Sequence, residues 1–193
     1  MGKVVIDITM SLDGFVTGPN DGPDNGLGDG GRVLHEWVFE GRTDADNLLL
    51  FEEPMRVTGA GILGRRTFDI ANEAWGENPP FGKSQVFVLT HRPHETLQRG
   101  ATTFIFVTDG MESALKQARA AAGDKNVALM GADVSQQYLK AGLVDEIEIH
   151  LANVLLTAGR PLFAHIGDQQ IKLERQRVIA TPAVTHLCYR VIK

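Results

Sequence analysis

The sequence predicts an α/β fold with a mixed, mostly parallel central sheet, formed by one domain over residues 1–193. Short runs of β-branched and apolar residues alternate with helical patterns about four times, which is typical of strand–helix–strand units. After residue 144 the pattern indicates strands alone, so antiparallel strands are expected to complete the sheet. A chain of 193 residues that is 43% apolar is long enough to bury a core without disulfide staples.

The first part of the chain is expected to hold a strand, a long loop and a helix. Val4–Thr9 has the β-branched content of a short buried strand. Seven glycines and two prolines then fall between Gly14 and Gly31, which predicts either a functional loop or a surface insertion. Val33–Phe39 fits a strand or a short amphipathic lid. Thr43 is placed to cap a helix that continues to Phe51, because acidic residues follow it in the first turn.

Strands and helices then alternate. Strands are expected at residues 60–64, 85–90, 103–107 and 126–130, and a helix at 66–73. Asp109 with Glu112, and Asp133 with Gln136, have the spacing of capping boxes and predict two further helices. Residues 144–154 alternate as in a strand with one wet face, and residues 172–180 and 184–191 suit an antiparallel pair.

Charge and cysteine content exclude several classes of protein. The formal net charge is −5, which argues against a nucleic-acid binder or an anionic-membrane binder. One cysteine, Cys188, excludes an internal disulfide and a cysteine-based metal cage. The histidines are scattered, so no metal site is expected. The chain has no run of 18 apolar residues and no signal-peptide pattern, so a cytoplasmic protein is expected.

Three turns that follow predicted strands have the composition of anion sites. They are Gly64-Arg65-Arg66-Thr67, Thr90-His91-Arg92 and Gly131-Ala132-Asp133. A phosphate is bound by free N–H groups at a helix N-terminus and by charge-assisted hydrogen bonds from arginine. Ligands of open α/β sheets bind beyond the carboxyl ends of the strands. If the strands are parallel, the three turns share one edge and suit an extended anion such as a dinucleotide.

Five motifs occur in a recognisable order. They are Thr9-Met10-Ser11-Leu12-Asp13-Gly14-Phe15-Val16, Ala60 to Leu63 running into Gly64-Arg65-Arg66-Thr67-Phe68, Val88-Leu89-Thr90, Leu129-Met130-Gly131-Ala132, and Leu156 through Arg160-Pro161-Leu162-Phe163. Together they cover nearly the whole chain. The sequence thereby resembles the dihydrofolate-reductase-like superfamily, and within it the branch named for the C-terminal reductase domain of bifunctional riboflavin-biosynthesis proteins.

The resemblance implies a three-layer α/β/α fold, NADPH as cofactor and a homodimer. It implies that Arg65, Arg66 and Thr67 meet the phosphates, and that Thr90, His91 and Arg92 meet the adenosine 2′-phosphate. It also implies that Gly131 and Ala132 meet the pyrophosphate, although the family has a second glycine at the latter position. Thr9 and Val16 match positions that touch the nicotinamide.

One departure bears on the substrate. Folate reductases place a carboxylate on the first helix, facing the pterin, and the matching position here is Asn47. Asp46 lies one position away, about 100° around a helix. A neutral amide does not anchor a protonated pterin as a carboxylate does, so folate is not the expected substrate.

The leading hypothesis is an NADPH-dependent reductase of the 5-amino-6-(5-phosphoribosylamino)uracil reductase type. It would pass a hydride to a C=N or C=O bond of a small pyrimidine- or pterin-like substrate. The proton is expected from Asp13, Asp46 or an ordered water, and Trp37, Asn47 and Phe51 are expected on the substrate side. A true dihydrofolate reductase and a non-catalytic nucleotide-binding dimer are the alternatives.

Overall fold

The structure is a computed structural model that describes residues 2–39 and 52–193. The first half contains β1 (Val4–Ser11), β2 (Phe15–Thr17), the 3₁₀ helix η1 (Gly31–His35), α1 (Glu36–Phe39), β3 (Thr58–Gly64), α3 (Arg65–Trp75) and β4 (Gln85–Leu89). The second half contains β5 (Leu97–Arg99), β6 (Thr102–Val107), α4 (Met111–Ala122), β7 (Asn126–Met130), α5 (Ala132–Lys140), β8 (Glu146–Ala152), β9 (Arg160–Pro161), β10 (Leu173–Ala180) and β11 (Val184–Val191).

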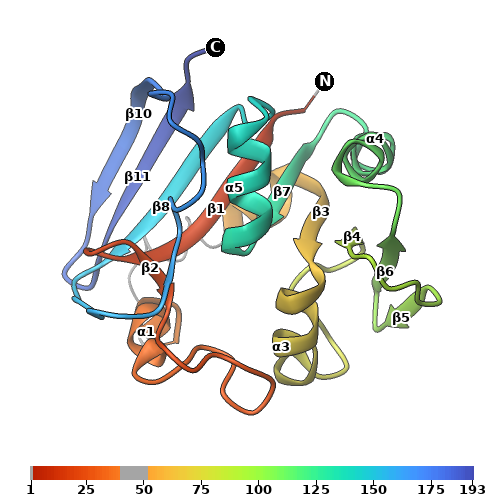
Figure 1. The fold of residues 1–193 in the computed structure, drawn as a ribbon, viewed down its shortest axis with the longest axis horizontal. Coiled ribbons are helices and arrows are strands. Elements are labelled where there is room, and N and C mark those ends of the chain that lie inside the picture. The colour runs from red at the N-terminus through yellow and green to blue at the C-terminus, as the bar shows by residue number, and fades with distance from the viewer. Residues whose placement is uncertain (1, 40–51) are drawn as a thin grey trace.

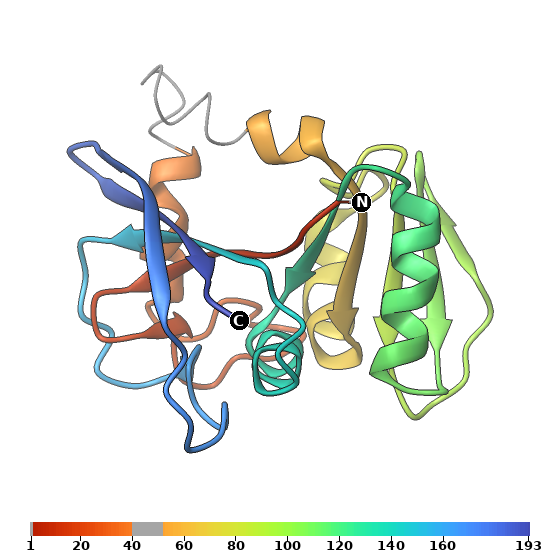
Figure 2. The ribbon, with the colours of Figure 1, turned by 90° about the horizontal axis from the view of Figure 1, so that it is seen from above.

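A nine-stranded sheet runs through the described part of the chain in the order β10-β11-β8-β1-β7-β3-β4-β6-β5 (Figure 1). The neighbours from β8 to β6 are parallel, while β11, β10 and β5 add to the sheet in antiparallel fashion. Figure 2 shows the β10–β11 hairpin at one end of the molecule and β5 with β6 at the other. The predicted mixed, mostly parallel sheet is therefore confirmed.

Side chains that alternate along the central strands bury two apolar clusters, one on each face of the sheet. Ile62 and Phe87 belong to the larger cluster, together with side chains of α4 and α5. Leu63 and Val88 point the other way and pack with Phe68 of α3. Helices thus cover both faces, which gives the expected three layers.

The glycine-rich segment after β2 is held together by its own polar groups. The amides of Asn20 and Asn25 donate to the carboxylate of Asp29 at 2.7 and 2.8 Å. The backbone N–H of Gly18 donates to the carbonyl of Leu27 at 2.8 Å. The segment therefore forms a defined loop rather than a loose insertion.

Several expectations about local structure are corrected. Of the two alternatives for Val33–Phe39, the strand is wrong, because these residues form most of η1 and all of α1. The two capping boxes are wrong, because glycines (Gly110 and Gly131) occupy the N-cap positions of α4 and α5 and no side chain caps either helix. The amide of Gln136 donates instead to the carbonyls of Pro161 and Leu162, at 3.0 and 3.1 Å.

Candidate functional site

Three predicted anion turns lie side by side at one edge of the sheet. β7, β3 and β4 are neighbouring parallel strands. Their carboxyl ends lead into Gly131, Gly64 and Thr90, respectively. The structure therefore brings together the three segments in the way that an extended ligand requires.

Two of these turns form a cradle of backbone donors. Gly64 and Gly131 are the N-caps of α3 and α5, and neither helix has a side-chain cap. Gly131 has a φ of +91°, and a Cβ added there would meet Oγ1 of Thr67 at 2.3 Å. The turn is thus closely packed against the first turn of α3. First-turn N–H groups without a side-chain cap are a fitting site for phosphate oxygens, so the geometry fits a dinucleotide cofactor.

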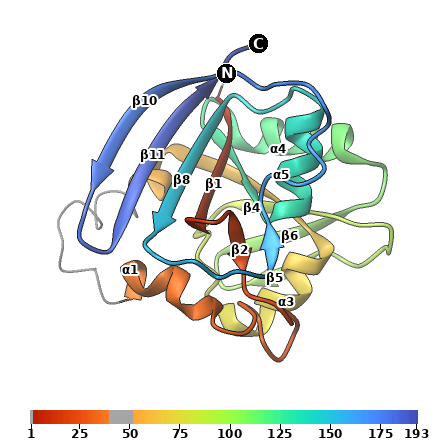
Figure 3. The same cartoon turned by 60° about the vertical axis from the view of Figure 1, so that its left-hand side comes forward.

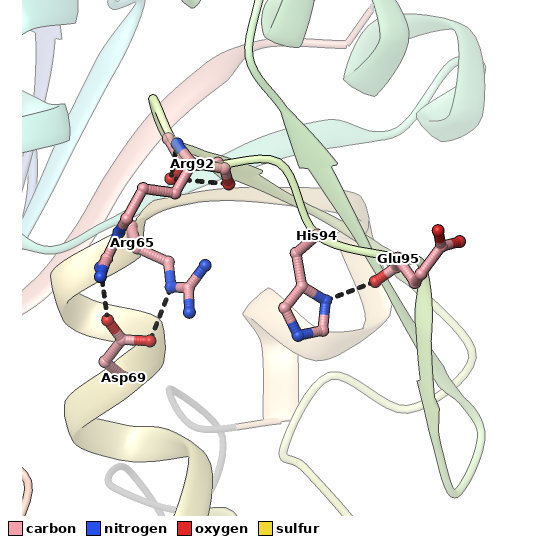
Figure 4. A network of polar contacts seen from close by, with 6 residues as sticks. Arg65, Asp69, Arg92, His94 and Glu95 are labelled. Carbon is pink, nitrogen blue, oxygen red and sulfur yellow. Dashed lines mark hydrogen bonds and ion pairs between the residues drawn. The ribbon is translucent and has the colours of Figure 1, made fainter.

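A network of charges flanks this cradle, with Asp69 at its centre (Figure 4). Arg65 Nε donates to one carboxylate oxygen of Asp69 at 2.6 Å, and Arg92 Nη2 donates to the other at 3.1 Å. The Arg65 guanidinium also lies 5.4 Å from the ring centroid of Phe106. The structure thereby unites Arg65 and Arg92, which come from α3 and from the loop after β4. Two guanidiniums against one carboxylate leave a net positive charge there.

The other arginines contact a carboxylate of the glycine-rich loop. Arg66 Nη2 lies 3.0 Å from Oδ1 of Asp21, and Arg160 Nε lies 3.5 Å from Oδ2. Arg66 also donates to the backbone carbonyl of Asp21 at 2.6 Å. Arg160 pairs in addition with Asp133 of α5 at 3.3 Å. Asp21 therefore neutralises part of the charge of two cations near the cradle.

The remaining predicted cofactor residues differ in their surroundings. Thr90 is buried, and its hydroxyl accepts a hydrogen bond from the backbone N–H of Arg92 at 3.0 Å, which fixes the turn. His91 is exposed beside it. Ala132 is buried at the start of α5, and Val16 packs in the larger apolar core.

Asp13 holds two loops together. Its carboxylate accepts hydrogen bonds from the hydroxyl of Ser11 at 2.6 Å and from the backbone N–H groups of Leu156 and Thr157 at 3.1 and 2.7 Å. The Ser11 hydrogen bond, followed by those from the backbone, lowers the pKa of Asp13 below its ordinary value. Because these hydrogen bonds favour the ionised carboxylate, Asp13 suits a structural role better than the role of proton donor.

The sheet face beneath α1 is polar. Thr9 of β1, His150 of β8 and His186 of β11 occupy paired register positions and so project from the same face. Trp37 of α1 covers them: its indole N–H donates to the hydroxyl of Thr9 at 3.2 Å, and its ring centroid lies 4.7 Å from that of His150 and 5.1 Å from that of His186. Trp37 is itself buried. Figure 3 shows α1 at the carboxyl end of β8.

The two histidines contact each other, and His150 also contacts the carboxylate of Asp7. Nδ1 of His150 lies 2.7 Å from Nδ1 of His186, and Nε2 of His150 lies 2.9 Å from Oδ1 of Asp7. Burial lowers the pKa of His35 in η1, and the charge of nearby His150 lowers it further. These residues join titratable groups from β1, β8 and β11 in one continuous chain.

An ion-pair network lies beside the histidines, around Glu148, which precedes His150 by two residues on β8. Arg177 of β10 contacts Glu148 at 3.0 Å and Glu53, in the helical segment 52–57, at 2.9 Å. Burial raises the pKa of Glu148, and the neighbouring Asp7 adds to that effect. The face that the sequence indicated as wet is thus covered, with His150 only 4% exposed.

Sequence reasoning missed Asp7, Glu148, His150, His186 and Arg177. A signal was present, because polar residues alternate with isoleucine along β8. Three further predicted residues, Asp46, Asn47 and Phe51, lie outside the described residues. Within the described ranges, no group of three or more His, Cys, Asp or Glu is arranged to hold a metal ion. Among the helices that the structure describes, none is long and apolar enough to cross a membrane.

Comparisons with known proteins identify the family of the chain. The family model described as the RibD C-terminal domain matches residues 2–187. A curated relative, "Uncharacterized protein YyaP" of Bacillus subtilis, is 23% identical over 94% of this chain and 92% of its own length.

Solved structures show the same fold. A putative riboflavin biosynthesis protein from Shewanella sp. PV-4 superposes with a TM-score of 0.73 at 20% identity, over 99% of both chains. Dihydrofolate reductase from Enterococcus faecalis, complexed with NADP(H) and RAB-propyl, superposes with a TM-score of 0.59 at 17% identity, over 100% of this chain and 98% of its own. The chain belongs to the RibD C-terminal domain family, and its fold is like that of dihydrofolate reductase.

Proposed function

We propose that this chain is an NADPH-dependent reductase of the riboflavin-biosynthesis type, acting on a small pyrimidine- or pterin-like substrate. The observation that carries the proposal is the cradle at the carboxyl edge of β7, β3 and β4, where two glycine N-caps meet and arginines gather. Family membership supports a reductase, and the enterococcal neighbour was solved with NADP(H). The substrate type is that of 5-amino-6-(5-phosphoribosylamino)uracil reductase.

Each part of the edge would have a distinct task. The turns at Gly64 and Gly131 would bind the pyrophosphate through backbone N–H groups. Arg65 and Arg92 would bind the 2′-phosphate, in competition with Asp69. Thr9, beneath Trp37, would lie nearest the nicotinamide. Bound NADPH would supply the hydride, while the protein positions the substrate and excludes water.

Cofactor binding is the first test. NADPH and NADH are titrated against the protein by fluorescence at moderate salt, and NADPH should bind about fivefold more tightly, or about 1 kcal/mol. This is less than the roughly 1.5–3 kcal/mol of hydrogen bonds to charged groups, because Arg92 is 69% exposed and Asp69 already neutralises part of the charge. Arg92→Ala should reduce the preference, whereas Lys83→Ala, an exposed cation outside the site, should not. Equal affinities for the two cofactors would count against the assignment.

Turnover is the second test. NADPH oxidation is followed at 340 nm with 5-amino-6-(5-phosphoribosylamino)uracil, related pyrimidines and dihydrofolate. Reduction of the pyrimidine supports the proposal, and efficient reduction of dihydrofolate alone makes the protein a folate reductase. Tight NADPH binding without turnover of any substrate supports the non-catalytic nucleotide-binding protein.

A further inference from the structure

We propose that Asp7, His150 and His186 form a proton relay that supplies the proton accompanying hydride transfer, with Asp7 as the donor to the substrate. The proposal rests on the reductase function proposed above and names the acid of that reaction. It assigns a role to the polar face of β1, β8 and β11, which an α/β sheet ordinarily fills with apolar side chains.

The two distances define where protons must lie. Oδ1 of Asp7 and Nε2 of His150 are 2.9 Å apart, and an ionised carboxylate only accepts, so Nε2 of His150 carries a proton. Nδ1 of neutral His150 is then a lone pair, and it faces Nδ1 of His186 at 2.7 Å. That second contact is a hydrogen bond only if Nδ1 of His186 carries a proton. The three groups therefore hold two protons in line, each between a donor and an acceptor.

Exposure decides which end meets the substrate. The Asp7 side chain is 24% exposed, that of His150 is 5% exposed, and His186 as a residue is 2% exposed. Trp37 packs over both imidazoles, so water and substrate approach the relay at Asp7. Asp7 also lies two residues before Thr9 on the same face of β1, beside the proposed nicotinamide position.

Proton transfer would follow these two contacts. The substrate carbon receives the hydride, the π bond of C=N or C=O breaks, and its electron pair takes the Nε2 proton of His150 by way of the Asp7 carboxylate, which ends ionised as it began. His150 takes at Nδ1 the proton shared with His186, which starts as an imidazolium and is left neutral with its remaining proton on Nε2. Nε2 of His150 then presents a lone pair to a carboxylate, an unfavourable contact that favours reprotonation by water after the product leaves.

Within the described residues, other titratable groups face the relay from β8, β10, β11, η1 and the helical segment 52–57. Glu148 lies beside Asp7 in the register of β8, and Cys188 follows it on β11. Arg177 of β10 and Glu53 complete that row, and His35 approaches His150 from η1. The Glu148–Arg177 pair keeps one carboxylate compensated, so that Asp7 is the carboxylate bonded to the histidines.

The test uses the full chain and begins without cofactor. Nitrogen-15 NMR of the imidazole rings should show His150 protonated at Nε2 and one proton shared between the two Nδ1 atoms. His186→Gln should abolish the shared-proton signal. Rings that carry no proton between their Nδ1 atoms would overturn the relay even if the protein is an active reductase.

Kinetics then separate a relay from a packing role. His150→Gln and His186→Gln should each lower kcat by about 10- to 100-fold, since general acids contribute about 10²–10⁴-fold, while leaving the NADPH dissociation constant within twofold. In the wild type, the pH profile of kcat should contain a limb that depends on the relay. Both variants should lack that limb. His165→Asn is the control, because His165 is a left-handed loop residue (φ 55°) that asparagine tolerates.

The outcomes distinguish the two proposals. Variants that keep the wild-type kcat and pH profile would overturn the relay and leave the reductase proposal standing. Variants that lose NADPH affinity and kcat together would indicate a packing role and also overturn it. If the wild type oxidises no NADPH with any substrate, the reductase proposal fails and the relay's catalytic role fails with it.

Discussion

The Asp21 contact leads to a direct prediction about cofactor affinity. Its carboxylate lies 3.0 Å from Arg66 and 3.5 Å from Arg160, so a phosphate that uses either guanidinium must displace it. Asp21→Asn removes the negative charge but keeps the backbone carbonyl that accepts from Arg66 at 2.6 Å. The variant should therefore bind NADPH more tightly than the wild type.

The magnitude follows from the exposure of the pairs. Asp21 is 13% exposed, but Arg66 and Arg160 are 46% and 31% exposed, so water screens both contacts. Exposed pairs contribute about 0.2–1 kcal/mol each, and two of them give about 1 kcal/mol. This corresponds to about fivefold tighter binding.

Fluorescence titration of NADPH measures the effect, at about 0.1 M salt and again at about 0.5 M. The gain should shrink at the higher salt, because the Debye length falls from about 10 Å as ionic strength rises. Asp24→Asn is the matched control, with the same change of net charge at an exposed position of the same loop. If Asp21→Asn gains no more affinity than Asp24→Asn, Asp21 does not compete with the cofactor.

Three further predictions concern stability and reactivity. Gly131→Ala should destabilise the protein by about 1–2 kcal/mol in urea unfolding, because its φ is positive. Gly110→Ala should destabilise it less, because Gly110 has a similar φ of +99° but nothing within 4 Å of an added Cβ. Adding Thr67→Ala to Gly131→Ala should recover the difference. Asp13 has a lowered pKa, so its stabilisation is present above its unfolded value of 3.8 and is lost as pH falls through the folded value; Asp13→Asn should flatten the acid limb of a stability-against-pH curve. Burial raises the pKa of Cys188 to about 11, so a thiol reagent at pH 8 should modify the native protein far more slowly than the unfolded chain.

Local patterns predicted most of the parallel part of the sheet. The runs that became β4 and β6 are rich in β-branched and aromatic residues, and those that became β3 and β7 are short apolar runs, so these strands could be assigned without tertiary information. The same patterns placed Gly64 and Gly131 at strand ends. Short strands such as β2 and β9 were missed, because pairing between Phe15 and Pro161 depends on loops far apart in the sequence.

The polar face of β1, β8 and β11 could not be predicted from local sequence patterns. Asp7, His150 and His186 lie in three segments that are neighbours only because β8 inserts between β1 and β11. Alternation along β8 indicates which side chains share a face, but not whether that face meets water or a helix. Trp37 decides the matter by packing on the histidines, and its position depends on the course of the glycine-rich loop.

The place of β1 in the sheet has a consequence for how the protein is made. β1 is translated before its partner strands, yet Val4 pairs with Val127 and Thr9 with His150. On the ribosome, this strand must wait with both edges open until β7 and β8 have left the exit tunnel. Such distant pairing makes for slow folding. During synthesis, a chaperone would be expected to shield β1, which carries apolar residues such as Ile6 and Ile8.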